Sequence, residues 1–173
     1  MIKKTLLATI SVLIILVMAS CTAGQNTQAP SFTLTSIKGN QVSLSDYKGQ
    51  KAVLLLFFNN NIGTGQDPFL QSYLALYKGM DKLETLCVMN RATLPEEVKQ
   101  LMASQSQVTP GGLGFAVPLK DEDGSVSRAY GANPDILTLV LLDRDGNIRF
   151  RQEIISTVDT NTELTKQIEE LTK

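Results

Sequence analysis

Apolar and polar positions alternate along the chain in a way that predicts several short strands. Residues 51–58, 83–89 and 136–142 contain nearly continuous apolar runs. Such runs are typical of strands that are covered on both faces of a sheet. Residues 31–36 instead alternate, with Phe32 and Leu34 on one face, which predicts a half-buried strand. Residues 147–155 follow a turn ending in Gly146 and are expected to return antiparallel to 136–142.

Between these strands, apolar residues recur at helical spacing behind residues that favour helix starts. Two of the segments open with Thr-x-x-Glu, the spacing of a capping box. Another opens with Asp67-Pro68, an N-cap acceptor followed by proline at the first helical position. The predicted helices run from Asp67 to Tyr77, Thr93 to about Ser104, Ser125 to Tyr130 and Thr160 to Leu171.

The order of these elements predicts an α/β domain over residues 30–173. Two parallel strand–helix units come first, and an antiparallel hairpin and a closing helix follow. The expected architecture is a mixed central sheet flanked by helices.

The first residues have the features of an export signal. Lys3 and Lys4 precede an apolar run over residues 5–19, which is shorter than the roughly 20 residues of a membrane span. Met18-Ala19-Ser20-Cys21 then resembles a bacterial lipobox. We therefore expect a signal peptide over 1–20, a lipidated Cys21, and a flexible tether up to residue 29 that holds the domain to a membrane outside the cytoplasm. Ordinary cleavage near Ala19 and an uncleaved N-terminal anchor are the alternatives.

Composition narrows the possible chemistry. The 173 residues carry a net charge of -1 without a basic run, so no nucleic-acid partner is expected. Histidine does not occur, which excludes an imidazole base and a histidine metal site. Only Cys21 and Cys87 are cysteines, too few for a disulfide framework. We expect neither a metal nor another cofactor.

Several motifs resemble the redoxin branch of the thioredoxin superfamily, which contains the alkyl hydroperoxide reductase and thiol-specific antioxidant proteins and membrane-anchored thioredoxin-like reductases. The similar segments are Ala29–Leu34, Gly39–Gly49, Val53–Phe58, Tyr130-Gly131 and Leu141–Ile148. The resemblance implies a thioredoxin-like fold over about residues 29–172.

The resemblance also implies where an active site would lie. The family places its reactive cysteine after the strand that ends here at Phe58, at the start of the next helix, where the helix dipole favours a thiolate. No cysteine lies between Asn59 and Pro68. The matching loop is therefore a degenerate active site, and no catalytic residue is assigned. It consists of Asn59, Asn60, Asn61, Ile62, Gly63, Thr64 and Gly65, the last four standing where reductases carry Cys-x-x-Cys. The family's cis-proline is not matched in residues 136–138, and Pro134 is out of register.

Other residues offer little to replace the cysteine. Thr64 has no base near it in the sequence, and Asp67 is expected to cap a helix. Cys87 lies in the middle of a predicted strand, which favours a buried, inert thiol over a redox role. The three asparagines 59–61 either present amides to a ligand or form a polar turn.

These observations favour a non-catalytic binding or assembly protein, anchored through its N-terminal lipid and recognising a protein partner in the envelope. The loop after Phe58 and the nearby segment 133–137 would form the contact site. A redoxin-type oxidoreductase, using Cys87 or a partner's thiol, is the alternative. Copper delivery is disfavoured because that role normally needs a cysteine pair and a histidine.

Overall fold

One sheet organises the chain in a computed structural model that describes residues 27–58, 77, 80–104, 117–154 and 162–173. In these ranges the strands are β1 (Thr27–Gln28), β2 (Thr33–Ser36), β3 (Gln41–Ser43), β4 (Ala52–Phe58), β5 (Leu83–Asn90), β6 (Val117–Asp121), β7 (Leu137–Leu142) and β8 (Asn147–Ile154). The helices are the 3₁₀ helix η1 (Leu44–Tyr47), α2 (Glu96–Ser104), α3 (Ser125–Ala129) and α4 (Thr162–Thr172). Within the same ranges, none of the helices combines the length and apolarity needed to cross a bilayer.

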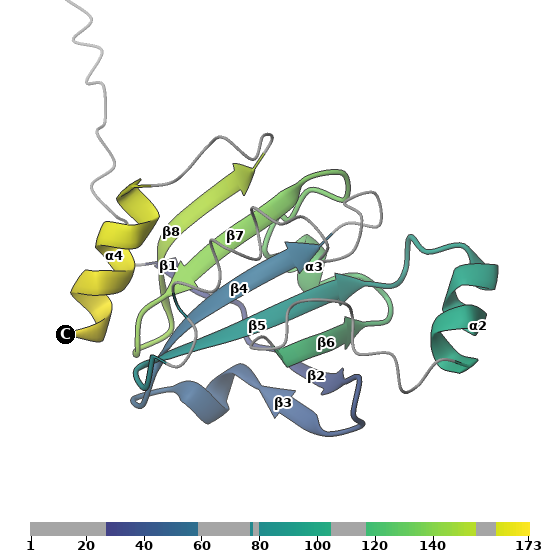
Figure 1. The fold of residues 1–173 in the computed structure, drawn as a ribbon, viewed down its shortest axis with the longest axis horizontal. Helices are drawn as coiled ribbons and strands as arrows, with labels where there is room; N and C mark the ends of the chain where they lie inside the picture. The colour runs from purple at the N-terminus through teal and green to yellow at the C-terminus, as the bar shows by residue number, and fades with distance from the viewer. Residues whose placement is uncertain (1–26, 59–76, 78–79, 105–116, 155–161) are drawn as a thin grey trace, which may run out of the picture.

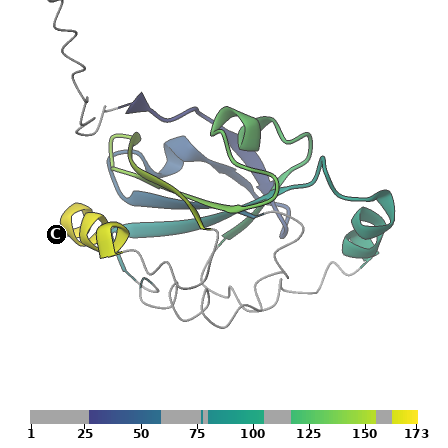
Figure 2. The same ribbon diagram turned by 90° about the horizontal axis from the view of Figure 1, so that it is seen from above.

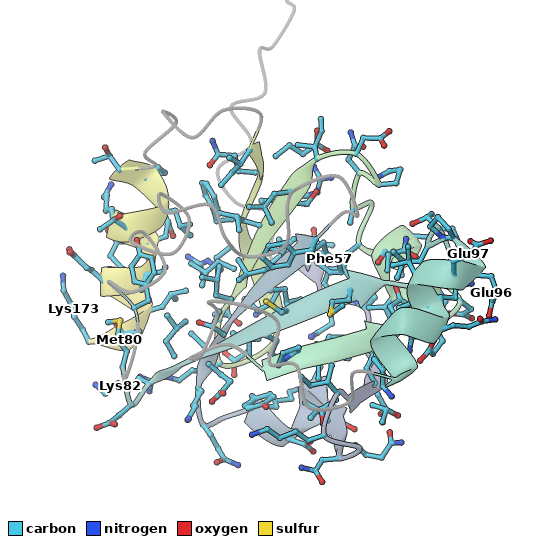
Figure 3. All side chains as sticks on the ribbon, turned by 45° about the vertical axis from the view of Figure 1, so that its right-hand side comes forward. Phe57, Met80, Lys82, Glu96, Glu97 and Lys173 are labelled. Atoms are coloured by element: carbon cyan, nitrogen blue, oxygen red, sulfur yellow. The ribbon has the colours of Figure 1, made fainter. Side chains whose placement is uncertain are left out.

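The sheet is mixed, as predicted, with the strand order β1-β8-β7-β4-β5-β6-β2-β3 (Figure 1). β4, β5 and β6 run parallel, whereas β7 and β8 are antiparallel to their neighbours. Figure 3 marks the two ends: Lys82 and Lys173 lie together where β5 begins, and Glu96 and Glu97 lie on α2 beyond its carboxyl end. The carboxyl end of the parallel strands is where open α/β sheets usually place their ligands.

β4 is buried on both faces, which explains its uninterrupted apolar sequence. Ala52, Leu54 and Leu56 pack in one cluster with α4, and the intervening residues pack in a second cluster with the N-terminal segment and Tyr130. Figure 2 shows α3 and the segment between β1 and β2 on the same side of the sheet. Because successive strand residues point to opposite faces, a strand in this position needs apolar side chains throughout.

The helices agree with the predictions where they lie in the described residues, except at the start of α2. The helix was expected to begin at Thr93 but begins at Glu96. Leu94 precedes Pro95, and a residue before proline is disfavoured in the helical conformation. The first helical hydrogen bonds accordingly run from Val98 and Lys99 to the carbonyl of Pro95. The predicted helix from Asp67 lies outside the described residues apart from its last residue, Tyr77.

The predicted tether needs correction at its C-terminal end. Thr27 and Gln28 form β1 and pair with β8, and Ala29 is only 6 % exposed. The Ala29 N–H also donates to the carbonyl of Gly146 at 2.9 Å. These residues therefore belong to the folded domain. Their small polar side chains suggested a linker, but pairing at a sheet edge uses the backbone and needs no apolar side chain.

Candidate functional site

The expected active-site position follows the carboxyl end of β4, where the strand ends at Phe58. The predicted degenerate loop Asn59–Gly65 and the predicted cap Asp67 lie outside the described residues. The described elements nearest to this point are β5, β6 and the start of β7.

The turn before β7 lies beside the end of β4. Thr138 stands opposite Phe57 in the antiparallel pairing and is completely buried. Its hydroxyl accepts a hydrogen bond from the N–H of Asn133 at 3.3 Å. The Asn133 side chain in turn accepts from the N–H of Asp135 at 2.9 Å, forming an Asx turn. The segment expected to approach the loop is thus held next to the strand from which the loop departs.

Cys87 lies inside the sheet and not at this end. It pairs with Leu56, two residues before β4 ends, and its side chain packs in the cluster that faces α4. The thiol is free, only 3 % exposed, and burial raises its pKa far above the usual range. Thiol chemistry requires an accessible thiolate. The prediction of a buried thiol is confirmed, and burial in this position disfavours the Cys87 thiolate and shields the sulfur from solvent.

A buried carboxylate fixes the neighbouring strand end. Asp121, the last residue of β6, is completely buried and accepts hydrogen bonds from the N–H and the hydroxyl of Ser127, both at 2.7 Å. A longer bond of 3.4 Å comes from the N–H of Val126. The carboxylate thereby satisfies donors at the start of α3 and holds that helix on the sheet. Nothing in the local sequence Asp121-Glu122-Asp123 marks Asp121 as the buried carboxylate.

Tyr130 fastens the N-terminal segment to the core. Its hydroxyl donates to the carbonyl of Pro30 at 2.7 Å, and its ring centroid lies 5.2 Å from that of Phe57. Burial raises the pKa of Tyr130, which keeps the phenol a donor. The sequence could have indicated such a contact, because a tyrosine that is buried normally finds a hydrogen-bond partner for its hydroxyl.

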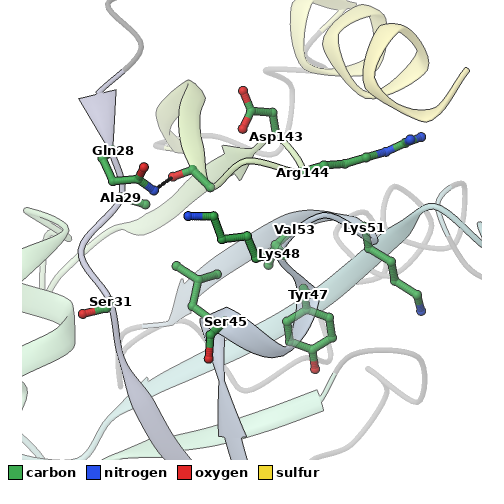
Figure 4. A pocket seen from close by; sticks show the side chains of 12 residues that line it. Gln28, Ala29, Ser31, Ser45, Tyr47, Lys48, Lys51, Val53, Asp143 and Arg144 are labelled. Carbon is green, nitrogen blue, oxygen red and sulfur yellow. Dashed lines mark hydrogen bonds between the residues drawn. The ribbon is translucent and has the colours of Figure 1, made fainter.

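The structure also contains a hollow that the sequence did not predict (Figure 4). It encloses about 430 Å³ between β1, η1 and the turn joining β7 to β8. Val53, at the start of β4, contributes to its floor, whereas the expected active-site loop follows Phe58. The five-residue separation along β4 corresponds to about 17 Å, so the hollow is not the family's active site.

Comparison with known proteins establishes the relationship suggested by the motifs. Residues 26–151 match the model of the AhpC/TSA family, which is well over half of the chain. The chain belongs to the AhpC/TSA family. It is 30 % identical over 135 residues to alkyl hydroperoxide reductase E of Mycobacterium bovis, which covers 72 % of this chain and 81 % of the relative.

Solved structures confirm the thioredoxin-like fold of this AhpC/TSA chain. A putative thiol:disulfide interchange protein DsbE from Chlorobium tepidum superposes with a TM-score of 0.62 at 24 % identity, covering 87 % of this chain and 99 % of the other. An exposed lipoprotein thioredoxin, Etrx1, from Streptococcus pneumoniae gives 0.62 at 19 % identity, covering 82 % and 100 %.

Because the AhpC/TSA match contains a single cysteine, the position of that cysteine decides whether the matched region offers an accessible thiol. Residues 26–151 contain one cysteine, Cys87, and it is buried in a central strand. In the part of the chain that the structure describes, no three histidine, cysteine, aspartate or glutamate side chains are grouped so that they could hold a metal ion. The described residues therefore provide neither an accessible thiol nor an apparent metal centre.

Proposed function

We propose that this AhpC/TSA protein is a membrane-tethered envelope lipoprotein that acts by binding a partner and not by thiol chemistry. The observation that carries the proposal is the burial of Cys87, the one cysteine in the family match. Burial strongly favours its protonated form, and the packed strands around it exclude a substrate. The thioredoxin-like scaffold is retained, and one fold can carry different functions in different proteins.

The tether is supported by the sequence Met18-Ala19-Ser20-Cys21 behind an apolar run. A protein of the same fold from Streptococcus pneumoniae is described as an exposed lipoprotein thioredoxin. In the present chain, β1 begins six residues after Cys21. A lipid at Cys21 would thus hold the domain close to the membrane surface.

The inertness of the thiol can be measured directly. Full-length protein in a neutral detergent should consume hydrogen peroxide and reduce insulin no faster than buffer alone, with a thioredoxin as the positive control. A thiol reagent should leave Cys87 unmodified in the native protein and modify it after unfolding in urea, because only unfolding exposes the sulfur.

A second function is favoured by the family and by the 30 % identity to alkyl hydroperoxide reductase E. In that case the protein is a thiol-dependent oxidoreductase that uses Cys87 after an opening of the fold, or a thiol of its partner. Turnover above the buffer control that disappears in Cys87→Ala would establish this function and refute the binding-only proposal.

The proposed partner site is the loop 59–65 together with segment 133–137. The loop's asparagine amides can both donate and accept hydrogen bonds, so a peptide segment or a small polar ligand suits it better than a second thiol. Replacing Asn60 and Asn61 with alanine should remove a partner that wild-type protein captures from solubilised membranes, without changing the unfolding temperature. The control variant is Asn40→Ala with Gln100→Ala, two exposed amides located elsewhere. Full retention of every partner by the loop variant would exclude the loop as the contact site.

A further inference from the structure

The hollow at the start of β4 is formed by three chain segments that are hydrogen-bonded to one another. The Gly49 N–H donates to the carbonyl of Arg144 at 2.7 Å, which joins the end of η1 to the β7–β8 turn. The Gln28 side chain donates to the carbonyl of Gly146 at 2.8 Å, which joins β1 to the same turn. Because these bonds fix its walls, the hollow is present without a ligand.

Two cations at the hollow are not neutralised by the protein. Lys48 and Arg144 have no ion-pair or hydrogen-bond partner for their side chains among the described residues, whereas Lys51 is paired with Glu84 at 2.8 Å. Figure 4 shows Lys48 extending across the hollow toward the β7–β8 turn and Arg144 leading outward from that turn. Arg144 is half-buried, and its long, flexible side chain can turn toward a bound anion.

The carboxylate at the hollow does not cancel this charge. Asp143 Oδ1 accepts from the N–H groups of Asp145 and Asn147 at 3.0 and 2.8 Å. Its Oδ2 lies 3.7 Å from Arg149 Nη1. Since Asp143 is engaged in the turn and faces its own cation, the surplus positive charge of Lys48 and Arg144 remains.

The floor of the hollow is apolar. Ala29 and Val53 are 6 % and 2 % exposed, and Leu44 and Tyr47 line the adjoining wall. A volume of about 430 Å³ lies in the range of small-molecule sites and exceeds what an inorganic anion fills. The combination of unpaired cations at the rim with an apolar floor suits an amphiphile with an anionic head.

We propose that this hollow binds the phosphate headgroup of an anionic phospholipid. Lysine and arginine are suited to phosphate, and the apolar floor would receive the carbon atoms next to it. The choice of a membrane lipid rests on the proposed anchor at Cys21, because the six residues from Cys21 to Thr27 span at most about 20 Å. The charge and shape of the hollow do not depend on that anchor.

The proposal can be tested by titrating full-length protein in dodecyl maltoside micelles with dihexanoyl-phosphatidylglycerol, while backbone NMR shifts of Ala29, Lys48 and Gly146 are followed. We expect saturable shifts that dihexanoyl-phosphatidylcholine and inorganic phosphate reproduce only at least tenfold more weakly. Lys48→Gln combined with Arg144→Gln should weaken phosphatidylglycerol binding at least tenfold. The matched control is Lys38→Gln with Lys166→Gln, two exposed lysines outside the hollow, and it should bind like wild type.

Three results would overturn the proposal: no saturable shift, equal binding by the Lys48/Arg144 variant, or inorganic phosphate binding as tightly as the lipid. The two substitutions break no ion pair or side-chain hydrogen bond of Lys48 or Arg144 with a described residue, and circular dichroism should verify the fold of each variant. Repeating the titration with Cys21→Ala separates the two proposals, because a competent hollow binds the lipid in micelles whether or not Cys21 is acylated.

Discussion

Replacing Cys21 with alanine is expected to abolish acylation of the protein completely. Lipoprotein processing attaches the lipid through the cysteine sulfur, and alanine provides no such atom. When the chain is expressed in a bacterium supplied with radiolabelled palmitate, the wild-type protein should carry the label and the Cys21→Ala variant should carry none. Mass spectrometry should also find the wild-type chain shortened to begin at residue 21 and increased in mass by its acyl groups.

The matched control is Cys87→Ala, which removes the other cysteine and should leave the label unchanged. Membrane fractionation alone would not decide the question, because the apolar run over residues 5–19 could hold an uncleaved chain in the membrane. Label that persists in Cys21→Ala, or that never enters the wild-type protein, would refute the lipid anchor and leave ordinary cleavage or the uncleaved anchor.

The central part of the fold was predictable because burial on both faces leaves a strong sequence signal. Residues 52–57 are all buried in β4 and all apolar, and residues 137–142 of β7 are all buried with one polar residue, Thr138. The Asp143–Gly146 turn indicated the antiparallel return of β8. In each case local pattern and tertiary position demand the same side chains.

Features that depend on distant contacts were not predictable. β1 is an edge strand whose small polar residues pair with β8, more than a hundred positions away. The hollow depends on β1, η1 and the β7–β8 turn meeting at one place, and nothing local in the sequence marks that meeting. Asp121 is buried and hydrogen-bonded to Ser127, whereas Glu122 and Asp123 beside it are exposed, and the local sequence does not distinguish the three acidic residues.

For the candidate site, the sequence predicted mainly the absence of a reactive cysteine after Phe58. The chain belongs to the AhpC/TSA family. However, no cysteine follows Phe58 at the position where thiol chemistry would be expected. The structure adds that Cys87 is buried inside the core, opposite Leu56, which lies two residues before the end of β4. The described part of the chain therefore offers no accessible cysteine, which is the reason that the proposals above concern binding surfaces.

Replacing Asp121 with alanine should produce the largest loss of stability at the carboxyl end of the sheet. The change leaves the N–H and hydroxyl of Ser127 without an acceptor in a buried place and also removes the bond from Val126. Hydrogen bonds to a charged acceptor contribute about 1.5–3 kcal/mol each, and orphaned buried donors cost a similar amount. Because the three bonds share one carboxylate and are not additive, we expect the free energy of unfolding to fall by about 3–4 kcal/mol.

The measurement is urea unfolding of full-length protein in detergent, followed by circular dichroism. Asp123→Ala is the matched control, since Asp123 lies two residues away, is exposed and accepts a bond from the N–H of Ser125. That variant should shift the midpoint only slightly because water replaces the lost contact. If Asp121→Ala were no less stable than Asp123→Ala, the carboxylate would not anchor α3. The bond from Arg151 of β8 to the Gly131 carbonyl and the Tyr130 hydroxyl bond to Pro30 would then be the polar contacts that hold this region in place.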